Sequence, residues 1–133
     1  MIFVNLPVAD IKASTRFYEA IGCTKNEDFS DDQSSMMVWS DTISFMLLAR
    51  QKFEGFSAKP IAGRDVSEVL LALSRDSRDE VDAIAEASAG AGGKADIRDP
   101  MDLGFLYNRS FEDPDGHVFE AVWMDPNAAK GNG

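Results

Sequence analysis

One carboxylate near the end of the chain stands out from its surroundings. Glu120 interrupts an otherwise apolar run that ends at Trp123. The run follows the turn 113–116, Asp-Pro-Asp-Gly, in which proline pre-sets one dihedral, aspartate bonds to nearby backbone and glycine accepts a positive φ. Apolar residues on both sides of the turn predict a hairpin with a four-residue loop. Glu120 therefore lies on a strand, where it either faces water or lines a cavity with a chemical role.

The predicted hairpin also supplies Glu120 with a partner. Counting back through a four-residue loop places Arg109 opposite Glu120 and Tyr107 opposite Val122. Cross-strand neighbours lie close enough for an ion pair. Two interpretations are open: an anchor for a polar or anionic ligand, because guanidinium binds carboxylates and phosphates in a fork, or a purely structural salt bridge. A bulge in the hairpin would put Ser110 opposite Glu120 and remove the argument.

The elements that must position these residues follow one order twice, strand-helix-strand-strand-strand. In the first half they are a strand over 2–8, a helix between Asp10 and Gly22, and strands over 23–29, 36–39 and 43–49. In the second half they are a buried strand over 69–73, a helix over 77–89, and strands over 94–98, 103–112 and 118–123. Residues 51–66 are rich in glycine, proline and mixed charge, and indicate a linker with a short helical turn.

Composition limits the possible partners. The chain has 133 residues, 44% of them hydrophobic, and a net charge of −10 with a pI near 4.4. Such acidity argues against nucleic acid or an anionic membrane as partner, because phosphate contacts need Lys and Arg. The single cysteine, Cys23, permits no internal disulfide and fits a cytoplasmic location. No apolar run is long enough to span a membrane, no signal segment is expected, and residues 127–133 are expected to form a flexible tail.

Three stretches together resemble the glyoxalase / bleomycin-resistance / extradiol dioxygenase superfamily, also called vicinal oxygen chelate. They are VNLPVAD at 4–10, FYEAIG at 17–22, and DPDGH at 113–117 followed by Glu120. The resemblance covers essentially the whole chain. It implies an α+β fold in which two βαβββ modules form a curled mixed sheet, or cup, with helices on the outer face. The modules would occupy about 1–50 and 67–126 of a single domain over 1–126, and a homodimer is expected.

The resemblance also implies a set of metal-ligand positions, and this sequence departs from it. In a glyoxalase I-like frame those positions fall near Phe3, Met46 and Leu70, and on Glu120. Only Glu120 can bind a hard or borderline cation, whereas a catalytic zinc or nickel site needs three or four protein ligands. His117 is the only histidine, so a two-histidine, one-carboxylate iron site is impossible. No metal cofactor is therefore assigned.

The resemblance and the missing ligands together favour a binding protein. The implied cup face is mostly apolar with a few polar groups, which suits a small organic molecule, although ordinary core packing would look the same. The expected ligand-binding residues are Phe3, Asn5, Met46, Leu70, Tyr107, Arg109 and Glu120. We expect a glyoxalase/bleomycin-resistance-like protein that binds a small, partly apolar molecule. The alternative is a metal-dependent lyase or dioxygenase of the same superfamily with Glu120 as ligand or base, and a structural or regulatory dimer is a third possibility.

Overall fold

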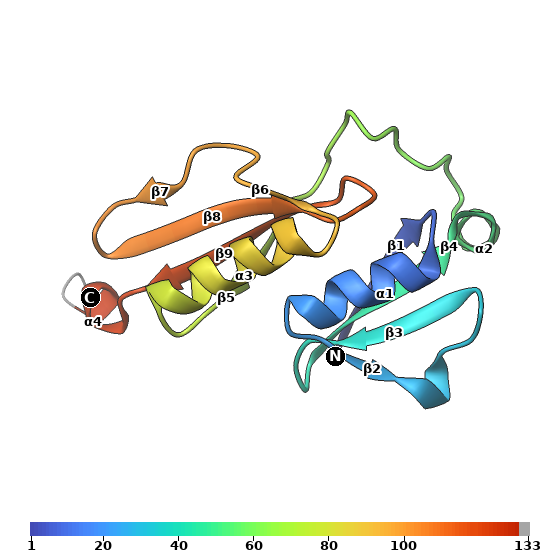
Figure 1. Ribbon diagram of the computed structural model, residues 1–133, viewed down its shortest axis with the longest axis horizontal. Helices are drawn as coiled ribbons and strands as arrows, with labels where there is room; N and C mark the ends of the chain where they lie inside the picture. The colour runs from blue at the N-terminus through green and yellow to red at the C-terminus, as the bar shows by residue number, and fades with distance from the viewer. Residues whose placement is uncertain (131–133) are drawn as a thin grey trace. The chain divides into compact units, whose positions relative to one another are not determined.

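The computed structural model describes residues 1–130, which fall into two compact units with their boundary between Val66 and Ser67. We call Met1–Val66 unit 1 and the described residues from Ser67 onward unit 2. Each unit has its own mixed sheet and its own helix against that sheet (Figure 1). The predicted α+β class with two βαβββ-like modules is confirmed. The expected curl into a common cup stays a prediction.

Unit 1 contains a four-stranded sheet in the order β1-β4-β3-β2, in which β1 and β4 run parallel and the other pairs antiparallel. Its elements are β1 (Ile2–Val8), α1 (Ile11–Ala20), β2 (Thr24–Asn26), the 3-10 turn η1 (Glu27–Phe29), β3 (Ser34–Val38), β4 (Ile43–Ala49) and α2 (Arg50–Phe56). The predicted strand over 43–49 and the short helix before residue 57 are confirmed. The strand predicted over 23–29 ends early because η1 follows it.

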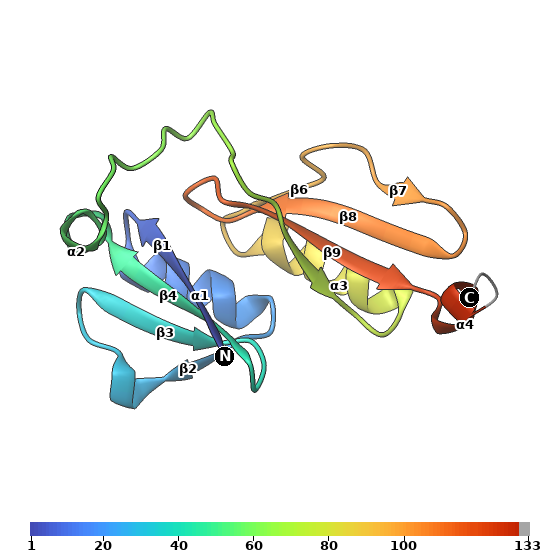
Figure 2. The same cartoon turned by 180° about the vertical axis from the view of Figure 1, so that it is seen from behind.

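Helix α1 covers one face of the unit 1 sheet. Asp10 caps its N-terminus, since Asp10 Oδ1 accepts a hydrogen bond from the Ala13 N–H at 3.1 Å, and the chain leaves the helix through Gly22 at φ +121°. Phe17 and Tyr18 are fully buried, and the Tyr18 ring centroid lies 5.5 Å from that of Phe45 on β4. Helix α1 therefore packs against the apolar side chains that point to one face of β1 and β4. The opposite face of the sheet is not covered by α1 (Figure 2).

Unit 2 repeats this plan with a sheet in the order β5-β9-β8-β6, and β7 also pairs with β8. Its elements are β5 (Leu71–Ser74), α3 (Arg78–Gly90), β6 (Lys94–Ala95), β7 (Met101–Asp102), β8 (Leu106–Glu112), β9 (Val118–Met124) and α4 (Pro126–Lys130). Ser77 caps the N-terminus of α3, since its Oγ accepts a hydrogen bond from the Glu80 N–H at 3.2 Å. Phe111 and Phe119 stack beneath it with ring centroids 5.3 Å apart. In each unit, we call the sheet face opposite α1 or α3 the open face.

Several predicted boundaries in unit 2 are wrong. The strand predicted from residue 69 begins at Leu71, and Leu70 precedes it with 60% of its surface exposed. The strand predicted over 94–98 stops at Ala95, because Asp96 adopts a φ of +56° and turns the chain. Residues 127–130, expected in a flexible tail, belong to α4, and the rest of that predicted tail, 131–133, lies outside the described residues.

The hairpin that contains Glu120 has a longer loop than predicted. Glu112 pairs with Val118, which leaves the five residues from Asp113 to His117 in the loop. Asp113 is buried, and its Oδ1 accepts hydrogen bonds from the N–H groups of Asp115 and His117, each at 2.9 Å. This side chain stabilises the extra residue in the turn. The register moves by one position as a result, so the predicted pairing of Arg109 with Glu120 is wrong.

Candidate functional site

Unit 1 contains a cavity of about 810 Å³ on its open face. Asn5 on β1 and Met46 and Leu48 on β4 form its sheet side. Residues of η1 and α2, including Phe29 and Phe56, form the remaining walls. Asn5 and Met46 are thus brought together as expected, since they are direct partners in the β1–β4 register. Phe3 lies on the same open face, two residues before Asn5, but does not line this cavity.

A fixed ammonium group lies in the wall of this cavity. Lys52 Nζ donates a hydrogen bond to Ser34 Oγ at 2.6 Å and lies 3.7 Å from Asp31 Oδ2. The pKa of Asp31 lies below its ordinary value, first because the Gln33 N–H donates to this carboxylate at 2.8 Å, and further because of the charge on Lys52. Sequence reasoning missed Lys52, because the short helix that presents it was interpreted as part of a linker.

Glu120 lies on the open face of unit 2, in contact with an arginine that sequence reasoning did not consider. Arg98 Nη2 donates to Glu120 Oε2 at 2.7 Å and to Asn108 Oδ1 at 3.1 Å. The residue directly opposite Glu120 in the register is Ser110. No local pattern could have indicated Arg98, because it lies in an irregular loop between β6 and β7. This loop lies against β8, where the Arg98 N–H donates to Ser110 Oγ.

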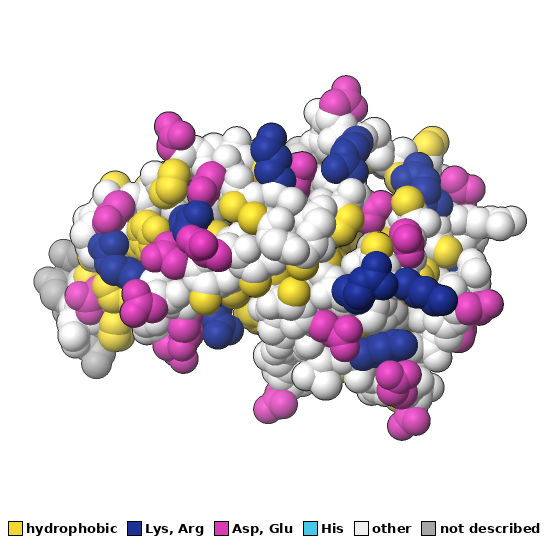
Figure 3. Space-filling view, in the orientation of Figure 1, with side chains coloured by type: hydrophobic (Ala, Val, Ile, Leu, Met, Phe, Trp, Pro, Cys, Tyr) yellow, Lys and Arg dark blue, Asp and Glu magenta, His cyan; other side chains and the backbone are white. Residues whose placement is uncertain are grey.

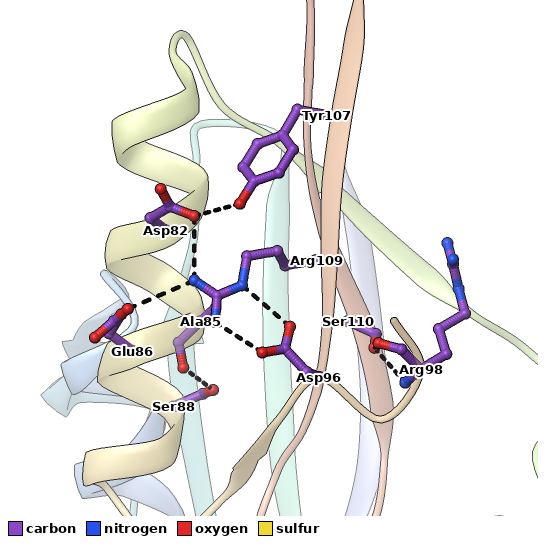
Figure 4. Close-up of polar contacts among 9 residues, drawn as sticks. All are labelled: Asp82, Ala85, Glu86, Ser88, Asp96, Arg98, Tyr107, Arg109 and Ser110. Carbon is purple, nitrogen blue, oxygen red and sulfur yellow. Dashed lines mark hydrogen bonds and ion pairs between the residues drawn. The ribbon is translucent and has the colours of Figure 1, made fainter. Parts of the chain in front are cut away.

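Arg109 and Tyr107 lie on the other face of the same sheet, against α3 (Figure 4). Arg109 Nη1 lies 3.1 Å from Asp82 and 3.6 Å from Glu86, and Nη2 lies 2.8 Å from Asp96. Tyr107 Oη donates to Asp82 at 2.6 Å, and this bond is the main reason why the pKa of Tyr107 is raised. The pKa of Asp96 is lowered by its bonds to Arg109. These contacts tie both side chains to α3, and Arg109 also to Asp96 in the turn after β6, rather than to Glu120.

Cys23 does not supply a nucleophile. Its side chain is buried, and burial raises the pKa of the thiol to about 12. The thiolate, which is the reactive form, is therefore negligible near neutral pH.

The residues at the implied metal-ligand positions do not fit a divalent metal. Phe3 and Leu70 have no donor atom, the Met46 thioether prefers soft metals, and the Glu120 carboxylate already accepts from the Arg98 guanidinium. Within residues 1–130, no three His, Cys, Asp or Glu side chains are grouped so that they could hold a metal ion. The donor set therefore departs from a metal centre in both composition and arrangement.

The surface charge is mixed but dominated by acids. On the face shown in Figure 3, Asp and Glu side chains are interspersed with Lys and Arg, in keeping with the net charge of −10. Among the helices that the structure describes, none has the length and apolar character needed to cross a membrane.

Comparison with known proteins agrees with this architecture. The family model described as Glyoxalase/Bleomycin resistance protein/Dioxygenase superfamily matches residues 2–121. A hypothetical protein from S. aureus is similar over 93% of both chains, with 25% identity and a TM-score of 0.80. A glyoxalase-related enzyme from Fulvimarina pelagi is similar over 92% of this chain and 86% of its own, with 21% identity and a TM-score of 0.77.

A fosfomycin resistance protein from Mesorhizobium loti has the same fold, with 18% identity and a TM-score of 0.69 over 98% of this chain and 96% of its own. No curated protein matches the chain. The family model spans nearly all of the described residues and both modules. The chain therefore belongs to the glyoxalase/bleomycin resistance protein/dioxygenase superfamily.

Proposed function

We propose that the protein binds a small, partly apolar organic molecule in the open-face cavity of unit 1. The cavity itself carries the proposal. Its volume of about 810 Å³ lies within the range of roughly 300–1,000 Å³ typical of small-molecule sites. Phe29 and Phe56 line it and are largely exposed. Burying such aromatic surface against a ligand is favourable, because apolar area is removed from water.

The lining suggests how a ligand would be oriented. Met46, Leu48 and Phe53 present apolar surface to the body of the molecule. The Asn5 amide, the Lys52 ammonium and the carboxylates of Asp28 and Asp31 add polar groups to the lining. A pocket of this kind takes an apolar or aromatic body with one or two polar substituents.

The alternative of a metal-dependent lyase or dioxygenase has less support. Such an activity would rest on Glu120 as ligand or base. Glu120 lies in unit 2, where its carboxylate already accepts a hydrogen bond from Arg98 of the same unit. The cavity and Glu120 belong to different units, so we base the proposed function on the cavity alone.

Methyl NMR of protein labelled at methionine Cε tests the proposal, with a fragment library of neutral and singly charged aromatic and aliphatic compounds as probe. Binding fragments should shift the Met46 methyl signal. Met46→Trp fills the cavity and also removes this signal, so its effect is followed on the fragments themselves by saturation-transfer NMR, where binding should be abolished. Phe56→Ala, at a position that is 76% exposed, should weaken binding about five- to tenfold through lost apolar contact.

The matched control is Val122→Trp, which places the same side chain on the open face of unit 2. This variant should bind the same fragments with unchanged affinity. The proposed site would be contradicted if every fragment that binds leaves the Met46 signal unshifted. It would also be contradicted if the fragments bind Met46→Trp and the unmodified protein with equal affinity.

A further inference from the structure

A second group of polar side chains lies on the open face of unit 2, and its hydrogen-bonding capacity is only partly used. We call Arg98, Asn108, Ser110 and Glu120 the Arg98 cluster. Arg98 Nη2 joins Glu120 and Asn108 at 2.7 and 3.1 Å. Figure 4 shows Arg98 and Ser110 on the side of the sheet away from Arg109. The cluster is therefore separate from the ion pairs that attach α3.

Arg98 is held at both its backbone and its guanidinium group. Its backbone N–H donates to Ser110 Oγ at 3.0 Å, and the same hydroxyl donates to the Arg98 carbonyl at 3.4 Å. Ser110 is only 3% exposed, and its carbonyl accepts from the Asp96 N–H at 2.7 Å. The loop is thus bonded to β8 while Glu120 holds the guanidinium. A positioned side chain loses less conformational entropy when a ligand binds.

Three hydrogen-bonding groups of the cluster remain available. Among the described residues, none accepts from Arg98 Nε or Asn108 Nδ2, and none donates to Glu120 Oε1. The guanidinium side chain is 46% exposed, whereas the Glu120 side chain is 16% exposed. The cluster therefore presents two kinds of donor next to one acceptor of opposite charge.

We propose that the Arg98 cluster binds a zwitterionic amino carboxylate. In this cluster the Arg98 guanidinium contacts the Glu120 carboxylate, which a metal ion would otherwise bind. Arg98 and Asn108 bind the carboxylate, and Glu120 Oε1 accepts from the ammonium group. The charges of Arg98 and Glu120 cancel, so a simple anion would gain little and would be repelled by the net charge of −10. A ligand that carries both charges matches both partners.

The neighbouring side chains indicate an apolar substituent on that ligand. Val122 stands opposite Asn108, and Ala72 stands beside Glu120 in the β5–β9 register. Both point to the open face, because directly paired residues share a face of the sheet. An aliphatic amino acid places its side chain over these two residues.

The test uses three matched probes at equal ionic strength: L-leucine, 4-methylpentanoate, which lacks the amine, and isopentylamine, which lacks the carboxylate. Nitrogen-15 NMR follows the Arg98 Nε–H and Asn108 side-chain amide signals. Saturable shifts should occur at lower concentrations of leucine than of either other probe. Equal midpoints for leucine and 4-methylpentanoate, or no saturable shift with leucine, would overturn the proposal.

Variants separate this site from a merely structural salt bridge. Arg98→Gln should weaken leucine binding about tenfold, because a charge-assisted pair is lost. Glu120→Gln should remove the preference for leucine over 4-methylpentanoate, a change that loss of structure alone would not produce. Arg78→Gln is the control, because Arg78 makes a two-bond pair with Asp102 in the same unit, and it should leave binding unchanged.

Metal titration supplies an independent outcome. Stoichiometric binding of Zn²⁺ or Mn²⁺ that is lost in Glu120→Gln would overturn the proposal, because Glu120 would then serve a metal. The cluster lies in unit 2 and the proposed cavity in unit 1. Failure of the leucine titration therefore leaves the fragment result in unit 1 unaffected, and the reverse also holds.

Discussion

Two arginines, one in β8 and one in the loop that lies against the other face of the sheet, illustrate how much the surroundings of a residue decide. Arg109 is 14% exposed and is surrounded by Asp82, Glu86 and Asp96. Arg98 is far more exposed and keeps donors without partners among the described residues. Arg109 joins a helix to a sheet, whereas Arg98 faces solvent and keeps hydrogen-bond donors that a ligand could use. Their residue type alone does not distinguish these roles.

Replacing Arg109 by alanine should destabilise the protein. The three carboxylates around it would be left close together without a cation, so the free energy of unfolding should fall by about 2 kcal/mol, less than for a fully buried pair because the acids are partly exposed. Urea unfolding followed by circular dichroism measures the loss. Lys25→Ala removes an exposed pair with Glu27 and should cost less than about 1 kcal/mol. Equal losses in both variants would contradict the structural role of Arg109.

The sequence alone identifies Glu120 as a distinctive residue, but it does not identify the residue that contacts Glu120. An acid in an apolar run is visible in the chain itself, whereas its partner depends on strand register. One extra loop residue moved the position opposite Glu120 from Arg109 to Ser110. Because side chains alternate along a strand, that single shift placed Arg109 on the opposite face. Arg98 was beyond prediction, because its contact with Glu120 is made through a loop.

At the scale of elements, strong local signals were predictive and weak ones were not. The strand over 43–49 and the start of α1 at Asp10 follow from alternation and a capping side chain. Val69 and Leu70 look like the start of a strand because they are apolar, yet both are exposed and precede β5. Apolar character alone does not show whether a neighbouring strand is present to pair with.

Glycine at the end of α1 gives a prediction at this scale. Gly22 has a φ of +121°, and an added Cβ would lie 3.4 Å from Trp39 Cζ3. Gly22→Ala should therefore lower the free energy of unfolding by about 2 kcal/mol, mainly through backbone strain.

Gly55 is the matched control, because it lies within α2 with ordinary φ and open space around its Cα. Gly55→Ala should stabilise the protein by up to about 1 kcal/mol, since alanine is the better helix former. Thermal unfolding of both variants gives the comparison, and a stabilised Gly22→Ala protein would show that the C-terminal turn of α1 does not need glycine.

At the scale of the whole molecule, the duplicated order of elements was the most reliable feature of the sequence. Each unit places one long helix against one mixed sheet, and in each the first and last strands of the module pair in parallel. This regularity survives the boundary errors because it depends on the order of elements and not on their precise ends. The chemistry differs between units: unit 1 has the cavity, and unit 2 has the Arg98 cluster.

The segment between the units should be the first target of a protease. Residues 57–70 have no helix or strand and are mostly exposed. Trypsin should cut first after Arg64, because Lys59 is followed by proline and most other basic residues lie in or beside regular elements. Mass spectrometry of a brief digest should find fragments 1–64 and 65–133. A first cut within α1 or α3 would contradict the boundary between the units.

The parallel pairing of β1 with β4 has a consequence during synthesis. Within the described ranges, every strand pairing joins strands of one unit, and residues 2–49 contain all the strands of the first sheet. A ribosome therefore completes that sheet's sequence long before β9 is translated. Because the earlier part of a chain generally folds first, unit 1 can form while the rest is still being made. During that interval Phe3, which is half exposed even in the finished chain, and the open face of unit 1 are exposed to water on a nascent chain.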